Sequence, residues 1–223
     1  FHMDTGPQTN SHGRIAIWAI TPGGVNIGQR LSKVLENGCL LVSENAAGSG
    51  RPHSKAERFK NLRQEIENRF HDFSGHVFIF ATGIVVRMVA GLLVSKTSDP
   101  AVVVVDDCGH HAISLISGHL GGANHLTSQV AEIIGARPVI TTATDTNRKP
   151  AIDLIAQEAG LLIETPENIK RINMAFLCGK KIAVTDPENR ILHHIPAEHV
   201  TLGEAACANH EAIFCSYLFH VKR

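Results

Sequence analysis

The sequence lacks the clustered positive charge that is typical of proteins that bind nucleic acids. Its 223 residues hold 21 Lys and Arg against 21 Asp and Glu, which gives a formal net charge of +0. No basic stretch is longer than a pair such as Arg148-Lys149 or Lys180-Lys181. Because neutralising phosphates requires clustered Lys and Arg, the composition argues against nucleic acid as a partner.

The sequence also lacks long apolar runs and cysteine pairs. No apolar run approaches the ~20 residues that a membrane-spanning helix needs, so no membrane partner is expected. The five cysteines, at positions 39, 108, 178, 207 and 215, are odd in number and form no CxxC pair. We therefore interpret them as reduced cysteines of a cytoplasmic protein rather than as a disulfide framework.

Several short motifs with known chemistry are missing. No GxxxxGK[ST] or GxGxxG follows the first predicted strand, and Ser117 is not part of a GxSxG elbow, so nucleotide binding and a serine-hydrolase triad lose support. The chain has 14 histidines, but no HExxH or Cys/His spacing frames the pairs His110-His111 and His193-His194. These histidines are interpreted as dispersed surface or core residues, and no metal site of the protein itself is expected.

The residues present predict a layered α/β fold. With 43% hydrophobic and 19% charged residues the chain can bury a sizeable core. Strands are predicted at 15–20, 39–43, 76–80, 102–105, 112–116, 138–140 and 181–185, where the four valines of 102–105 indicate a strand covered on both faces. Helices are predicted at 27–35, 84–92, 118–135, 150–159 and 166–177. One more helix is predicted after Ser54, which would cap it, and this helix would carry Phe59, Leu62, Ile66 and Phe70 on one face.

The alternation of strands and helices predicts a largely parallel sheet with helices on both faces, followed by a smaller α/β unit. The expected domains are 14–147, which contains the substrate cleft, and 148–223. Residues 1–13 have no periodicity and are expected to be a tag or a disordered leader. The short turn at 106–111 favours a hairpin, so strands 102–105 and 112–116 should run in opposite directions.

Three strand-to-helix joints carry the candidate site. Ligands of open α/β sheets bind at the carboxyl ends of strands, where helix N-termini offer free N–H groups and glycine lets a ligand approach the backbone. The loops 81–87 and 117–122 share one sheet edge only if the segment 93–101 crosses the sheet, and we assume that it does. The candidate ligand-binding residues are Thr82, Gly83, Arg87, Ser117, Gly118, Gly121, Gly122, Asn124, Thr141, Thr142 and Asp145, and His119 is the candidate acid or base.

Each candidate has a purely structural alternative. Thr82, Ser117 and Asp145 could cap helices, and Gly121-Gly122 could let a helix pack closely on the sheet. Arg87 and His119 could be solvated or structural residues.

The segments ATGIVVR (81–87), KTSDPAVVVVDD (96–107), ISLISGHLGGANHLT (113–127) and PVITTATDTN (138–147) follow one another along the chain. Together they resemble the cobalt-precorrin-5A hydrolase family, the CbiG-type proteins of anaerobic cobalamin biosynthesis, over roughly residues 14–195. The resemblance implies a hydrolase that opens the δ-lactone of a cobalt-corrinoid intermediate, expels acetaldehyde and yields cobalt-precorrin-5B.

The resemblance also implies a carboxylate-rich tetrapyrrole as substrate, with cobalt carried inside it, so that the protein needs no cofactor. In the mechanism that we hypothesise, His119 is the general base for water, N–H groups near Gly121-Gly122 hold the oxyanion, and Arg87, Thr82 and Thr141 hold peripheral carboxylates. Family members usually carry a further C-terminal domain, so the alternatives are a non-catalytic corrinoid-binding module or subunit of the pathway, or an unrelated anion-binding protein. A homo-oligomer and contacts with neighbouring pathway enzymes are left open.

Overall fold

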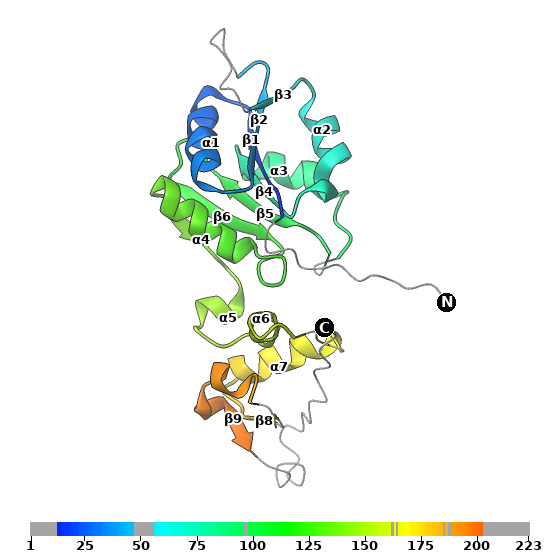
Figure 1. Ribbon diagram of the computed structural model, residues 1–223, viewed down its shortest axis with the longest axis vertical. Coiled ribbons are helices and arrows are strands. Elements are labelled where there is room, and N and C mark those ends of the chain that lie inside the picture. The colour runs from blue at the N-terminus through cyan, green and yellow to red at the C-terminus, as the bar shows by residue number, and fades with distance from the viewer. Residues whose placement is uncertain are drawn as a thin grey trace, which may run out of the picture. The chain divides into compact units, whose positions relative to one another are not determined.

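The protein is described by a computed structural model over residues 13–46, 56–95, 98–161, 163, 165–184, 186 and 189–202 (Figure 1). The chain divides into two compact units, Phe1–Ile140 and Thr141–Arg223. The domain ranges expected from the sequence, 14–147 and 148–223, stay a prediction, and residues 1–12 lie outside the described residues.

The first unit is built on a seven-stranded sheet in the order β3-β2-β1-β4-β5-β6-β7. All neighbouring strands are parallel except β5 and β6, which form an antiparallel pair. This confirms both the largely parallel sheet and the predicted hairpin. The strands are β1 (Ile15–Ala19), β2 (Gly38–Ser43), β3 (Glu57–Phe59), β4 (Gly75–Ile79), β5 (Ala101–Val105), β6 (His111–Ile116) and β7 (Arg137–Val139).

Helices cover both faces of this sheet, as predicted (Figure 1). α1 (Pro22–Val34) and α4 (Ala123–Ile134) cover one face, and α2 (Leu62–Arg69) and α3 (Thr82–Val89) cover the other. A short 3-10 helix, η1 (Phe70–Asp72), follows α2. The four valines predicted to be covered on both faces are at most 1% exposed. Val103 and Val105 point into the core under α1 and α4, whereas Val102 and Val104 point into the core under α2 and α3.

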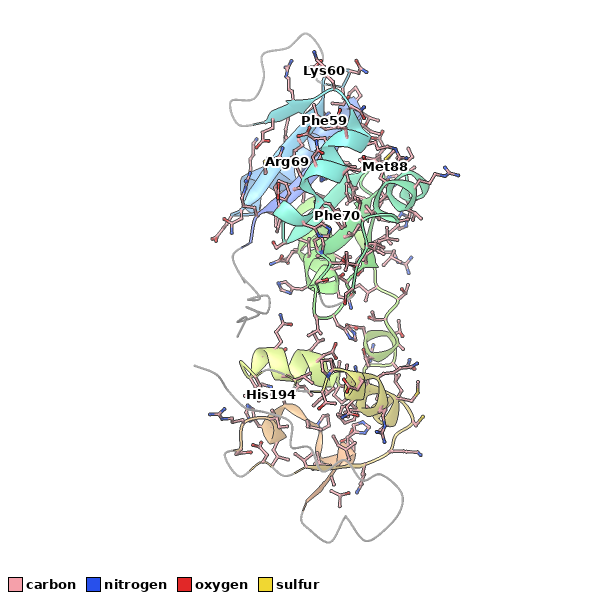
Figure 2. The ribbon with its side chains drawn as sticks, turned by 90° about the vertical axis from the view of Figure 1, so that its right-hand side faces the viewer. Phe59, Lys60, Arg69, Phe70, Met88 and His194 are labelled. Carbon is pink, nitrogen blue, oxygen red and sulfur yellow. The ribbon has the colours of Figure 1, made fainter. Side chains whose placement is uncertain are left out.

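The core under α2 and α3 is aromatic and encloses one histidine. Figure 2 labels Phe59 and Phe70 of this core, and Met88 of α3, which packs against it. His76 is 0% exposed; its Nδ1 accepts a hydrogen bond from Trp18 Nε1 (3.1 Å), and its Nε2 lies 2.9 Å from the Phe70 carbonyl oxygen. Both bonds are satisfied by a neutral ring that carries its proton on Nε2. Burial is the main cause that lowers the pKa of His76 from 6.5 to about 4.

Two helix predictions need correction at their amino ends. Phe59 lies in β3 and not in a helix, because α2 begins only after Asn61, whose Oδ1 accepts the Gln64 N–H at 3.2 Å. Ser54, the predicted cap, lies outside the described residues. The helix predicted from residue 118 begins at Ala123, because Ser117 and Gly122 have positive φ angles of 59° and 81° that a right-handed helix cannot contain.

The second unit is a smaller α/β assembly, as predicted. Asn173 joins its two longer helices, since its Oδ1 accepts the Ile152 N–H (2.8 Å) and its Nδ2 donates to Asp153 Oδ1 (3.0 Å). The predicted helices at 150–159 and 166–177 and the strand at 181–185 are present, whereas α5 and β9 were not predicted. Its elements are α5 (Ala143–Thr146), α6 (Ile152–Glu158), α7 (Glu167–Leu177), β8 (Ile182–Val184), the 3-10 helices η2 (Leu192–His194) and η3 (Ala197–His199), and β9 (Val200–Leu202), which pairs with β8 in parallel. Among the described helices of the chain, none has the length and apolarity to cross a membrane.

Candidate functional site

The strand directions place the two main candidate loops at opposite edges of the sheet. Ile79, the last residue of β4, pairs with Val105, whereas Ile116, the last residue of β6, pairs with Val102 near the start of β5. The joint that begins α3 therefore lies at the carboxyl edge of the parallel strands, and the joint at Ser117 lies at their amino edge. The expectation that both loops share an edge is wrong.

The physical reason lies in the connection between β4 and β5. These strands are parallel, with Gly75 opposite Ala101, so the chain that follows α3 must return to the amino edge before β5 begins. The hairpin then reverses β6. The segment 93–101 only returns the chain to the amino edge before β5, as in an ordinary crossover. β6 therefore still ends at the amino edge.

The third joint follows β7, which is parallel to β6 with Ile113 opposite Val139. β7 therefore ends at the edge where β6 ends, the amino edge of β1, β4 and β5. Thr141, Thr142 and Asp145 belong to the second unit. There Thr142 Oγ1 donates to Asp145 Oδ2 at 2.5 Å, and Asp145 lies within α5, so it does not cap the following helix α6, whose N-cap is Ala151.

The segment Ser117–Gly122, which we call the SGH turn, is compact and internally bonded. The Gly122 N–H donates to the His119 carbonyl (2.8 Å), the Ala123 N–H to the Ser117 carbonyl (3.0 Å), and the Asn124 N–H to the Gly118 carbonyl (3.0 Å). The Gly122 N–H is thus already used inside the turn and cannot also hold an oxyanion. Glycine is needed at position 122 because the φ angle of this residue is 81°.

Ser117 is the strained residue of the SGH turn. Its φ of 59° is left-handed, a region that residues other than Gly, Asn and Asp rarely adopt. Its Oγ is buried and has no hydrogen-bond partner among the described residues. A Cβ on Gly121 would lie 2.2 Å from Ser117 Cβ and 2.8 Å from its carbonyl oxygen, so only glycine fits there. Ser117 therefore does not cap α4, and Gly121 is required by its close contact with Ser117 within the turn rather than by packing of the helix on the sheet.

Two polar side chains, His119 within this turn and Asn124 just after it, differ in exposure. His119 is half-buried and lies between the two glycine-containing ends of the turn. Asn124 is 8% exposed, and its Oδ1 accepts a hydrogen bond from Ser114 Oγ at 2.7 Å, which ties α4 to β6. The geometry thus leaves His119 as the proton-transfer candidate of this edge and gives Asn124 a structural contact.

The start of α3 is the candidate ligand-binding site at the carboxyl edge. Its N-cap is Ala81, which offers no side-chain cap, so Thr82 is the first helical residue and not the cap considered above. Gly83 is exposed, and a Cβ there would meet no atom within 4 Å. No packing requirement explains this glycine, in contrast to Gly121. The Arg87 side chain is exposed, and no described residue forms an ion pair with it.

The structure adds Thr21, Gly23 and Asp107 to the carboxyl edge. From β1 the chain first continues to β2 and β3 on one side of β1, and then returns to β4 on the other side. The direction of winding therefore changes between β1 and β4, and α/β sheets usually bind ligands at such a point. Thr21 Oγ1 hydrogen-bonds the Asp107 carboxylate, and a Cβ on Gly23 would lie 3.0 Å from the Asp107 carbonyl oxygen. The position of Thr21-Pro22-Gly23-Gly24 directly after the first strand was the sequence signal for this place.

The chain matches known proteins over most of its length. The family model described as "Cobalamin synthesis G N-terminal" matches residues 64–145, and "Cobalamin biosynthesis central region" matches residues 150–215. The chain belongs to the CbiG family. Every candidate site residue, from Thr82 to Asp145, lies within the first of these two matches.

Two curated relatives of this CbiG-type chain are named cobalt-precorrin-5A hydrolase. That of Salmonella typhimurium is 40% identical over 171 residues, 76% of this chain and 47% of the relative, and that of Priestia megaterium is 35% identical over 173 residues, 77% of this chain and 46% of the relative. The chain thus spans about half the length of these relatives. A crystal structure of a putative cobalamin biosynthesis protein G homolog from Sulfolobus solfataricus is 29% identical, covers 79% of this chain and 52% of that chain, and has a TM-score of 0.46.

Proposed function

We propose that this chain carries the hydrolase activity of its relatives, opening the δ-lactone of cobalt-precorrin-5A with loss of acetaldehyde to give cobalt-precorrin-5B. The observation that carries the proposal is the 35–40% identity to two cobalt-precorrin-5A hydrolases over about three quarters of the chain. The substrate is a tetrapyrrole rich in carboxylates, and its cobalt arrives bound inside it. The reaction as proposed requires no cofactor of the protein, and the protein acts in the cytoplasm.

The SGH turn is the part of the structure that best supports a catalytic role. Strained backbone and unpaired buried hydroxyls are costly, and they concentrate where function requires them. Both occur at Ser117, two residues before His119. In our proposal His119 removes a proton from the water that attacks the lactone carbonyl, because imidazole titrates near neutral pH. Ser117, Gly118 and Gly121 shape the approach to it.

The start of α3 has a separate role in the proposal, because it lies at the other edge of the sheet. The first-turn N–H groups of a helix and an exposed arginine both attract carboxylates. Thr82, Gly83 and Arg87 therefore hold peripheral carboxylates of the substrate or of a neighbouring pathway enzyme, and they do not take part in the lactone chemistry. Thr141, Thr142 and Asp145 stay candidates for substrate binding in the second unit.

The test is an assay for acetaldehyde after incubation of the chain with cobalt-precorrin-5A. His119→Ala is expected to lower kcat by ~10²–10⁴-fold, the usual contribution of a general base, with corrinoid binding retained. The matched control is His125→Ala, an exposed histidine on the first turn of α4, which should leave kcat unchanged. Equal rates for wild type and His119→Ala would refute the role of His119.

The acetaldehyde assay also tests the second candidate function considered above, a corrinoid-binding module that presents the substrate to a partner. Binding of the corrinoid, measured by its absorption spectrum, without acetaldehyde release would select this module. Absence of both binding and acetaldehyde release would refute both functions.

A further inference from the structure

The turn between β5 and β6 gathers three metal-ligand side chains within five residues. One carboxylate oxygen of Asp106, Cys108 Sγ and one ring nitrogen of His110 all lie within 4.8 Å of one another. We propose that this turn is a binding site for a borderline divalent transition metal such as Zn²⁺ or Co²⁺. The site does not depend on the lactone chemistry, since it lies at the carboxyl edge and the SGH turn lies at the amino edge.

The backbone of the hairpin brings the three side chains together. Gly109 has a φ of 71°, and its N–H donates to the Asp106 carbonyl oxygen at 2.9 Å. A Cβ on Gly109 would lie 3.2 Å from Ile27 Cδ1, so this side of the turn rests on the core. The turn therefore folds back at Gly109 and sets Cys108 and His110 on either side of it, both close to Asp106.

The Asp106 carboxylate is already oriented by backbone donors. The Cys108 N–H donates to its Oδ1 (3.0 Å) and the His111 N–H to its Oδ2 (2.6 Å). Metal-ligating carboxylates usually receive such outer hydrogen bonds, which fix their direction and leave further lone pairs for the ion. One ligand of the proposed site is thus held in place before a metal binds.

The other two ligands are exposed and can adjust. The His110 Nδ1 atom lies 3.9 Å from Asp106 Oδ1, and the His110 side chain is 74% exposed. Around a tetrahedral zinc ion, oxygen and nitrogen ligands at about 2.0–2.1 Å from the metal stand roughly 3.3–3.5 Å apart. For His110 and Asp106 a shift of about half an ångström therefore suffices. One carboxylate, one thiolate and one imidazole suit Zn²⁺ or Co²⁺ better than Mg²⁺ or Ca²⁺, and they leave a fourth position open.

The experiment is a titration of the full chain with Co²⁺ under reducing conditions, followed by absorption spectroscopy. Wild-type protein is expected to develop a thiolate-to-cobalt charge-transfer band that Zn²⁺ displaces. Cys108→Ser should remove the band and weaken Co²⁺ binding by at least ~10-fold, no less than the loss of an outer-shell partner does. His110→Ala should weaken binding similarly, and because its side chain is exposed it should leave the fold intact.

The matched control is Cys178→Ser, since Cys178 is also an exposed free cysteine but lies outside the turn. This variant should keep both the band and the affinity for Co²⁺. A wild-type protein without the band, or a Cys108→Ser protein that keeps it, would overturn the proposal. Equal affinities of wild type and His110→Ala would remove His110 from the ligand set and overturn the three-ligand site.

Discussion

At the scale of single residues, the buried His76 links the fold to pH. Its ring is neutral in the folded protein, where the pKa is about 4, and regains a pKa near 6.5 on unfolding. Between these values the unfolded chain binds more protons than the folded one, so stability decreases as the pH falls from about 6.5 towards 4. The shift corresponds to roughly 3 kcal/mol.

The prediction is tested with His76→Gln, whose amide can accept from Trp18 and donate to the Phe70 carbonyl without titrating. Urea unfolding at several pH values between about 4.5 and 6.5 should show a clear loss of stability on acidification for wild type and a flatter profile for the variant. The carboxylates with lowered pKa, Glu57, Asp106 and Asp186, add to the loss of stability below about pH 5 equally in both proteins, so the difference between the two profiles reports His76. Parallel profiles of the two proteins would contradict the assignment.

At the scale of elements, two glycines at the candidate joints should respond oppositely to alanine. Gly121→Ala places a Cβ 2.2 Å from Ser117 Cβ and should destabilise the protein by ~1–3 kcal/mol, as overpacking does. Gly83→Ala meets no atom and should stabilise α3 by up to ~1 kcal/mol. Thermal unfolding of both variants provides the measurement, and a Gly121→Ala protein as stable as wild type would contradict the described turn.

Gly83→Ala is also informative about function. If the open space at Gly83 serves a ligand, the more stable variant should bind the corrinoid more weakly than wild type. Unchanged corrinoid binding would leave the start of α3 without a role in substrate recognition.

The sequence predicts the elements of this fold much better than it predicts their directions. The valines of 102–105 and the short turn at 106–111 identify β5 and an antiparallel partner, since both are signals of local sequence. The edge at which the SGH turn lies depends on how the segment 93–101 connects two distant strands, and no local pattern reports this. The start of α4 was misplaced because apolar spacing continues through the turn, whereas the positive φ of Ser117 has no signature in sequence.

The same limit applies to the candidate site. His119 and its glycines could be selected from residue types at a joint, but the contact between Thr21 and Asp107 joins positions 86 residues apart. Likewise, the cluster of Asp106, Cys108 and His110 has neither the HExxH nor the Cys/His spacing that was sought in the sequence. It becomes visible only when Gly109 reverses the chain.

At the scale of the whole molecule, the first unit has its own sheet and its own cores. Both core clusters and all seven strands of its sheet lie before Ile140. A fragment of residues 13–140 is therefore expected to fold alone and to unfold cooperatively in urea, with the same acid-dependent loss of stability as the full chain. A fragment without a cooperative transition would show that the second unit is needed for folding.

The two outer strands of the sheet are short, with three residues each in β3 and β7. The Arg137 N–H donates inward to the His110 carbonyl at 2.8 Å, and because backbone donors alternate along a strand, the outward position falls on Pro138. Proline has no N–H, so this border lacks the outward donor with which a strand of another copy would pair. The β7 border is thereby disfavoured for edge-to-edge pairing, and self-association of the protein is expected to use another surface.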